Sequence, residues 1–147
     1  MIATLARYRV PLGFVAGIAA LALARPTPRT WLVGLVIAGL GEAVRSWAAG
    51  HIEKGREITR SGPYRFVRHP LYLGSALIGA GAVVAAWSLP IAIVGAVYMG
   101  LTLAAAVRTE EATLDEKFAG AYTAYREGRA EPVVRRFSLR RAIANRE

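Results

Sequence analysis

The amino-acid sequence predicts an all-α, polytopic integral membrane protein with about four transmembrane helices and a C-terminal cytoplasmic amphipathic helix. Two observations carry this prediction. The chain of 147 residues is 54% hydrophobic, yet it contains 19 lysines and arginines. The charges gather in short basic segments between long uncharged runs instead of scattering as on a soluble domain, which is typical of a polytopic membrane protein. At this length we expect a single domain, residues 1–147.

The first predicted span, residues 10–24, is the shortest of the four. Its 15 residues contain no charge and cover about 22 Å as a helix, less than the roughly 30 Å of a hydrocarbon core. Arginines at both of its ends can snorkel to extend it. The basic residues before this run also resemble those of a signal peptide. The sequence Ala22-Leu23-Ala24 runs directly into Arg25 and Pro26 and gives no clear cleavage site, so we expect a retained helix.

The second predicted span, residues 31–49, is uncharged through Leu40 and then contains Glu42 and Arg45. These two residues are three apart and therefore share one face of a helix. One interpretation is an interfacial ion pair that fixes the depth of the helix. The other is a wall of a polar site, and the sequence does not decide between them.

Two further uncharged runs, residues 71–87 and 88–107, are separated by a break at residues 87–90 and predict a helical hairpin. Trp87 is expected at a membrane interface. The first run is rich in small residues, which let helix backbones approach closely. The same small residues predict a narrow apolar groove for a lipid tail, with Gly79 as the position to test.

The remaining segments, residues 50–70 and 108–147, are polar. In the second of them an apolar stripe predicts one amphipathic helix that ends near Glu127. Its members are Leu114, Phe118, Tyr122 and Tyr125. The arginines of the C-terminal tail are expected to attract anionic lipid headgroups. His51 has no partner at metal-ligand spacing, so we interpret it as an interfacial histidine.

The distribution of positive charge predicts the orientation. In a four-span arrangement sixteen lysines and arginines fall on one side and only Arg25 and Arg29 on the other. This asymmetry favours both termini in the cytoplasm. Residues 51–70 and 108–147 then lie on the same side, where two segments that are distant in sequence can form one site.

Composition also disfavours several classes of protein. The net charge of +9 is compatible with nucleic-acid binding, but the charge lies beside apolar spans, so membrane lipids are the expected partner. The chain has no cysteine, which excludes a disulfide framework, a thiolate metal site and a thiol nucleophile. No glycine-rich strand-turn-helix pattern of a soluble Rossmann enzyme is present.

The stretch from residue 61 to residue 74 concentrates turn-forming and ionisable residues. Gly62-Pro63 predicts a turn. His69-Pro70 predicts a helix start, because the residue before proline avoids the α region and proline favours the first helical position. We therefore expect Arg68 and His69 just outside a helix.

This stretch resembles the signature of the isoprenylcysteine carboxyl methyltransferase and phospholipid N-methyltransferase superfamily of membrane enzymes. The pattern stands here as GPYRFVRHPLYLG at residues 62–74 and RTEE at residues 108–111. The resemblance extends upstream to GEAVRSWA at residues 41–48 and downstream to FAGAYTAY at residues 118–125, about two thirds of the chain.

The resemblance implies S-adenosylmethionine as the cofactor. The residues that it implies for cofactor binding are Arg68, His69, Pro70, Tyr72, Gly74, Glu110 and Glu111. Arg108 and Glu111 are the expected catalytic residues, and Arg45 and Arg108 are expected to orient the acceptor. No metal is expected.

The expected methyl acceptor carries a lipid tail, because the site lies where bilayer meets cytoplasm. A prenylcysteine-like carboxylate and a phospholipid-like head group both fit. Two other classes of function stay open, namely a membrane reductase that uses NADPH on a lipid substrate, and a non-enzymatic membrane scaffold whose ionisable residues only orient the helices.

Overall fold

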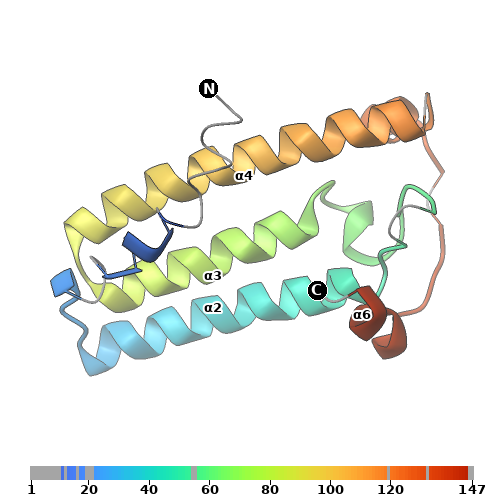
Figure 1. Cartoon of the computed structure of the whole chain (residues 1–147). Coiled ribbons are helices and arrows are strands. Elements are labelled where there is room, and N and C mark those ends of the chain that lie inside the picture. Colours follow the sequence, from blue (N-terminus) through green and yellow to red (C-terminus); the bar gives the residue numbers. More distant parts are fainter. Residues whose placement is uncertain are drawn as a thin grey trace. The chain divides into compact units, whose positions relative to one another are not determined.

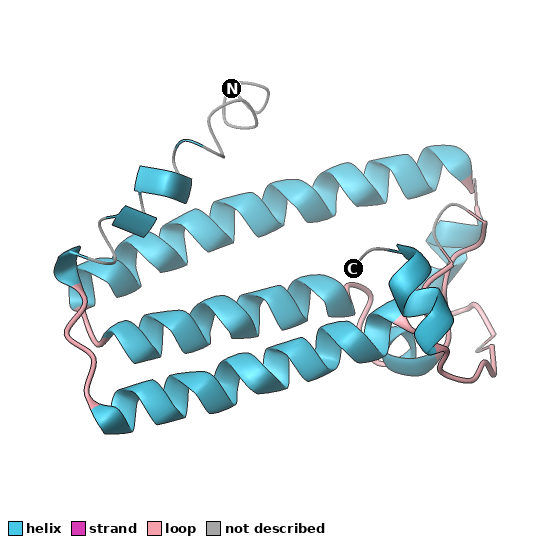
Figure 2. Ribbon diagram, turned by 60° about the horizontal axis from the view of Figure 1, so that its bottom comes forward, coloured by secondary structure: helices cyan, strands magenta, loops and turns pink. Residues whose placement is uncertain are grey.

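The computed structural model describes residues 11, 13–15, 17, 18, 22–53, 56–118, 120–131 and 133–145. Its helices are α2 (Pro28–Ala49), the short 3₁₀ helix η1 (Gly62–Arg65), α3 (Pro70–Ala86), α4 (Leu89–Lys117), α5 (Ala121–Arg126) and α6 (Leu139–Asn145) (Figure 1). These residues contain no strand (Figure 2). The all-α prediction is therefore confirmed.

The helix starts follow from the local sequence. At the start of α2, the Thr27 amide donates to Thr30 Oγ1 at 2.9 Å and the Thr30 amide donates to Thr27 Oγ1 at 3.2 Å. This reciprocal pair satisfies backbone N–H groups that a helix start leaves without partners. Helix α3 begins at Pro70, as predicted from the His69-Pro70 pair. Gly62 opens η1 with a φ of +57°, which a glycine adopts without strain.

Two helices of the described chain, α2 and α4, are long and apolar enough to cross a membrane. This number is smaller than the four that the sequence predicted. Helix α3 is apolar but has only 17 residues, fewer than the roughly 20 that span a hydrocarbon core. The predicted span at residues 10–24 falls mostly outside the described residues, although those described at positions 11, 13–15, 17, 18, 22 and 23 are helical.

The large apolar side chains of α2 and α4 point outward. Trp31, Leu32 and Leu40 of α2 are between 57% and 60% exposed, and Leu101 of α4 is 57% exposed. A water-soluble protein rarely exposes apolar surface on this scale. Such an exterior is typical of helices that face lipid.

The chain divides into two compact units, each of which draws on all three long helices. The first comprises residues 1–40 and 76–106, and the second comprises residues 41–75 and 107–147. In the first unit α2 and α3 touch through small residues. A Cβ atom on Gly34 would lie 2.4 Å from the carbonyl oxygen of Gly81, and one on Gly81 would lie 2.5 Å from that of Gly34. The small residues therefore serve close helix packing, as predicted.

Gly79 also serves packing. A Cβ atom there would lie 1.9 Å from the sulfur of Met99 on α4. The Met99 side chain thus fills the space in which the sequence predicted a groove for a lipid tail, and Gly79 is not the position that tests such a groove.

The prediction of one continuous amphipathic helix that runs to about Glu127 is wrong, because the structure divides this segment between two helices. Helix α4 continues ten residues past the predicted end of its span and stops at Lys117. Gly120, with a φ of +75°, then precedes α5. A positive φ is incompatible with a continuous right-handed helix, so Tyr122 and Tyr125 lie on a separate element.

We expect Gly34→Ala to destabilise the protein, because the added methyl group would meet backbone atoms of α3 that cannot move aside. Overpacking of this kind costs about 1–3 kcal/mol. The matched control is Gly39→Ala in the same helix, where nothing lies within 4 Å of the added atom. Thermal unfolding in detergent should show a lower midpoint for the first variant and an unchanged or slightly raised midpoint for the second. Equal midpoints would contradict the close contact.

Candidate functional site

The second unit contains a pocket of about 320 Å³. The loop after α2, the residues before α3, the C-terminal part of α4 and helix α5 contribute its walls. Its charged lining residues are Arg45, Glu53, Glu57, Arg68, His69 and Glu110. Its aromatic lining residues are Tyr64, Tyr72, Tyr122 and Tyr125.

The carboxylate of Glu111 joins three segments beside this pocket. Its Oε1 atom accepts hydrogen bonds from Tyr122 Oη at 2.9 Å, from His69 Nε2 at 3.0 Å and from Arg68 Nη1 at 3.3 Å. Tyr122 is 1% exposed, so its hydroxyl depends on this carboxylate for a partner. The two halves of the sequence motif, 42 residues apart, therefore meet in space as predicted.

His69 lies between two carboxylates. Its Nε2 is 3.0 Å from Glu111, and its Nδ1 is 3.7 Å from Glu110. A ring that offers both nitrogens to carboxylates is best satisfied as an imidazolium, because only the charged form donates from both atoms. The attraction of Glu110, and then that of Glu111, raises the pKa of His69 above its ordinary value, although burial opposes this shift.

Tyrosines form the aromatic part of the pocket. Tyr125 Oη donates to the carbonyl oxygen of Tyr64 at 2.7 Å, which ties α5 to η1. The hydroxyl of Tyr64 is buried and has no hydrogen-bond partner among the described residues. Burial raises the pKa of Tyr64, and Glu110 raises it further, so this group stays a neutral phenol at physiological pH. A buried polar atom without a partner in a pocket wall marks a position where a ligand atom can complete the hydrogen bonding.

Close packing of α2 against α3 brings Arg45 into the pocket wall. A Cβ atom on Gly74 would lie 2.6 Å from both the Arg45 Cγ atom and the carbonyl oxygen of Gly41. Arg45 Nη1 donates to Ser75 Oγ at 2.5 Å. Glu42 accepts from Ser46 Oγ at 3.4 Å instead and is not among the pocket residues. Of the two interpretations of this pair, the geometry favours Arg45 as the wall of a polar site.

The predicted site residues are placed as follows. Arg45, Arg68, His69, Tyr72 and Glu110 line the pocket. Glu111 bonds to two of them from beside it. Pro70 is buried at the start of α3 and serves the helix, while Gly74 serves the contact with α2.

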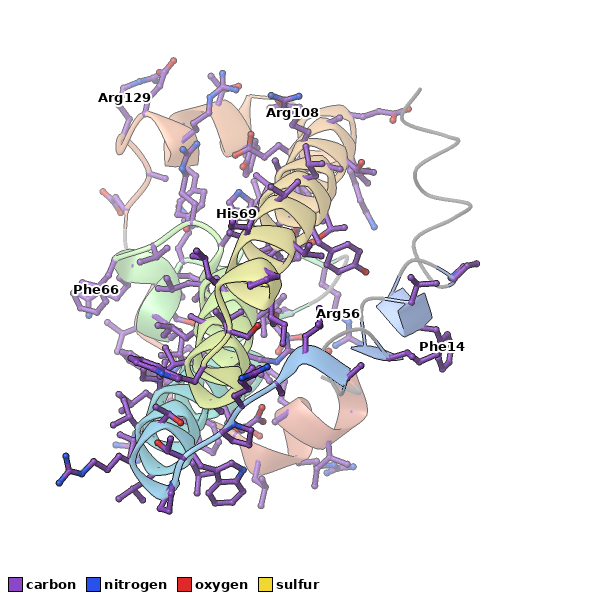
Figure 3. All side chains as sticks on the ribbon, turned by 90° about the vertical axis from the view of Figure 1, so that its left-hand side faces the viewer. Phe14, Arg56, Phe66, His69, Arg108 and Arg129 are labelled. Carbon is purple, nitrogen blue, oxygen red and sulfur yellow. The ribbon has the colours of Figure 1, made fainter. Side chains whose placement is uncertain are left out.

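Arg108 is exposed and does not line the pocket. In Figure 3 its side chain lies apart from that of His69. The position of Arg108 therefore does not support the prediction that it orients an acceptor. Arg45, the other arginine predicted to do so, lines the pocket.

The pocket also contains residues that were not predicted as site residues. Glu53 and Glu57 lie in the loop after α2, and Tyr64, Tyr122 and Tyr125 form the aromatic wall. The sequence did signal the tyrosines: Tyr122 and Tyr125 recur in the predicted apolar stripe and fall within the family resemblance at residues 118–125, and Tyr64 belongs to the motif at residues 62–74. Nothing in the sequence distinguished the two loop glutamates from other surface charges.

His51 is buried beside this region, and its hydrogen-bond partner is a backbone carbonyl of α2. Its Nδ1 lies 2.9 Å from the carbonyl oxygen of Trp47. Within the described ranges, no group of three or more histidine, cysteine, aspartate or glutamate side chains could hold a metal ion. The geometry therefore favours a structural role for His51.

The pocket can bind a zwitterion. Glu110 offers a carboxylate to a cationic group, and Arg45, Arg68 and the Tyr64 hydroxyl offer donors to an anionic group. Aromatic rings add faces that attract a cation. Opposite charges and aromatic faces gathered in one concave site form a typical small-molecule binding site.

Comparison with known proteins shows that the chain matches a protein family. A model of the family described as phospholipid methyltransferase matches residues 12–121. No curated protein and no solved structure matches the chain significantly.

We expect the stability that His69 contributes to depend on pH. Because its pKa is raised in the folded protein, the contribution is fully present below the unfolded value of about 6.5 and is lost as pH rises through the raised value. The difference in melting temperature between wild type and His69→Gln should therefore shrink between pH 6 and pH 9. A difference that stays constant or grows over this range would contradict an imidazolium between Glu110 and Glu111.

Proposed function

The chain belongs to the phospholipid methyltransferase family, and on this premise we propose that it transfers a methyl group from S-adenosylmethionine to a lipophilic acceptor at the cytoplasmic membrane interface. The observation that carries the proposal is the arrangement around His69. Its imidazole bridges Glu110 and Glu111 at the edge of a pocket that also holds Arg45 and Arg68.

The residues present fit this cofactor. S-adenosylmethionine has an ammonium group, a carboxylate and a sulfonium. Glu110 can accept from the ammonium group, since its side chain is 38% exposed. Arg68, whose side chain is 48% exposed, and the unpartnered Tyr64 hydroxyl can donate to the carboxylate.

When bound, the cofactor supplies an electrophilic methyl carbon on a sulfonium, which an acceptor takes by in-line displacement to leave a neutral thioether. The residues of the chain have the tasks of holding the acceptor in line and keeping water away from it. The tyrosine ring wall and the buried Tyr122 contribute to the exclusion of water.

The charge state of His69 bears on proton transfer. A carboxylate acceptor is already ionised and needs no base, whereas an amine must lose a proton. His69 holds its protons between two carboxylates and is therefore a poor base. Of the ionisable groups that line the pocket, a glutamate is the better proton acceptor for an amine. Arg45, which also lines the pocket, can orient an anionic acceptor.

A lipid-tailed acceptor is supported by the apolar exterior of α2 and α4. A prenylcysteine-like carboxylate and a phospholipid-like head group both suit the mixed charges of the pocket.

We also propose four membrane spans with both termini in the cytoplasm. The sixteen-to-two split of positive charge supports this orientation.

We expect Glu111→Gln to abolish or strongly reduce methyl transfer and to weaken S-adenosylmethionine binding at least about tenfold, or 1.4 kcal/mol. Glutamine keeps an oxygen that can accept from Tyr122 but removes the charge that holds His69. Glu116→Gln is the matched control, because Glu116 is an exposed carboxylate on the same helix. Calorimetry in detergent measures binding, and product analysis with methyl-labelled cofactor in membranes measures transfer.

Several results would contradict this assignment. If Glu111→Gln bound the cofactor as tightly as Glu116→Gln and wild type, Glu111 would have no part in cofactor binding. If wild-type membranes transferred no label and the purified protein bound NADPH instead, a reductase would be the better account. A scaffold would bind neither cofactor, and its Glu111 and His69 would tolerate exchange.

The proposed orientation is tested by single cysteines in a chain that has none of its own. A cysteine at Arg29 should react with an impermeant reagent added to intact cells, and one at Arg140 should react only with a permeant reagent. Both positions are exposed in the structure. Labelling of both from the same side would rule out the four-span orientation.

A further inference from the structure

The C-terminal residues 133–145, which we call the strap, lie beyond the part of the chain that the family model matches. The sequence predicted only that the arginines of this segment attract lipid headgroups. In the structure the strap packs on the end of α2 and on the loop that follows it, where α6 lies beside the C-terminal end of α2 (Figure 1).

Arg141 and Asn145 bind the backbone at the end of α2. Arg141 Nη1 donates to the carbonyl oxygen of Gly50 at 2.7 Å. Asn145 Nδ2 donates to the carbonyl oxygens of Ile52 at 2.9 Å and of Ala49 at 3.3 Å. The carbonyl of Ala49 is the last of α2, and the last carbonyls of a helix have no partner within the helix. Gly50 and Ile52 lie in the loop just beyond it, so Arg141 and Asn145 fix this junction from a distant part of the sequence.

Two arginines of the strap also hold carboxylates of the same loop. Arg141 Nε lies 2.8 Å from Glu53 Oε1, and Arg135 Nη2 lies 2.7 Å from Glu57 Oε1. Both arginine side chains are only 22% exposed. These two arginines are committed to the protein and are not free to meet lipid headgroups.

An aromatic contact closes the same junction. The ring of Phe137 lies against Gly50, where a Cβ atom would come within 2.1 Å of it. Its centroid is 6.1 Å from that of His51. Only glycine at position 50 leaves room for this ring where it lies, so the contact depends on both Gly50 in the loop and Phe137 in the strap.

The held carboxylates belong to the pocket of the proposed site. Glu53 and Glu57 line it together with His69 and Tyr64. Each is bound by an arginine of the strap. The loop between α2 and η1 has no regular structure of its own among its described residues, so its position as a pocket wall depends on contacts of this kind.

We propose that the strap is a built part of the binding site and that Arg141 and Arg135 are positioning residues, which hold Glu53 and Glu57 in place as one wall of the pocket. This inference rests on the proposed function. It predicts that the strap controls the affinity for the molecule that touches this wall, and that the rate of the chemical step depends on it little.

The test compares Arg141→Gln with Arg140→Gln in the full chain. The two arginines are neighbours with the same charge, but the side chain of Arg140 is exposed and makes no hydrogen bond or ion pair with another described residue. Arg141→Gln should weaken binding about tenfold, because it removes charge-assisted hydrogen bonds from a partly buried site. Arg140→Gln should stay within about twofold of wild type, as expected of an exposed charge.

Two separate measurements show which molecule touches the wall. Calorimetry gives the Kd for S-adenosylmethionine, and steady-state kinetics give the KM and kcat for the lipid acceptor. A rise in either Kd or KM with kcat nearly unchanged supports the proposal. Equal effects of both variants would mean that the tail acts through lipid headgroups, and that result would overturn it, as would a lower melting temperature of Arg141→Gln with unchanged Kd and KM.

A double-mutant cycle identifies the route of the effect. If Arg141 acts through Glu53, the pair Arg141→Gln and Glu53→Gln should weaken binding no more than the stronger single variant. Additive losses would overturn the positioning role. If Arg141→Gln does not fold, Arg141→Lys replaces it in the cycle, since lysine keeps the charge but cannot reproduce the fork that reaches Glu53 and Gly50 together.

Hydrogen exchange separates this proposal from the proposed function. Amides of residues 50–61 should exchange faster in Arg141→Gln than in Arg140→Gln, whether or not the protein binds S-adenosylmethionine. Faster exchange in a protein that neither binds the cofactor nor transfers a methyl group would reject the methyltransferase assignment alone. Unchanged exchange would reject the strap as a positioning element.

Discussion

A single carboxylate oxygen, Oε1 of Glu111, accepts hydrogen bonds from side chains on two other segments of the second unit. Arg68 and His69 come from the residues before α3, and Tyr122 comes from α5. Hydrogen bonds to a charged group contribute about 1.5–3 kcal/mol each, less where water reaches them. The exposed Arg68 therefore contributes the least, and the buried Tyr122 depends on the carboxylate most.

This arrangement explains why α4 extends so far beyond its apolar part. Glu110 and Glu111 are consecutive residues of α4, and the carboxylates of both lie beside the imidazole ring of His69. Continuation of α4 to Lys117 fixes the two carboxylates on a rigid element. The break at Gly120 then turns the chain so that α5 can return Tyr122 to Glu111 and Tyr125 to Tyr64. Rigid placement of binding groups reduces the entropy that a ligand must overcome.

Packing of small residues has a corresponding role in each unit. In the first unit Gly34 and Gly81 bring α2 and α3 into backbone contact. In the second, Gly41 and Gly74 do the same and leave Arg45 directed to the pocket wall. Close backbone approach with an apolar exterior is how helices associate in lipid, where burial of apolar surface gives no driving force.

Much of the fold could be predicted from the sequence, because its signals are local. The start of α3 at Pro70, the turn at Gly62 and the break between α3 and α4 follow from the conformational limits of proline and glycine. The meeting of His69 with Glu111 followed from charge asymmetry and from a specific two-part motif.

Other features depend on contacts that the sequence does not encode locally. The amphipathic stripe from Leu114 to Tyr125 fits one helix, and only the positive φ of Gly120 divides it. Arg108 was favoured because it adjoins the glutamate pair in sequence, but its face of α4 is exposed. The association of Arg141 with Glu53 spans 88 residues and has no periodic signal. Two equally basic neighbours, Arg140 and Arg141, differ only in what the folded chain places beside them.

A crystal structure of the protein with S-adenosylhomocysteine, the product form of the cofactor, would show directly whether this pocket is the cofactor site. We expect the amino-acid end of the ligand to lie within hydrogen-bond distance of Glu110 and of Arg68 or the Tyr64 hydroxyl, in the pocket that His69 and Glu53 line. Ligand bound elsewhere, with this pocket closed by its own side chains, would rule out the pocket beside His69 as the cofactor site.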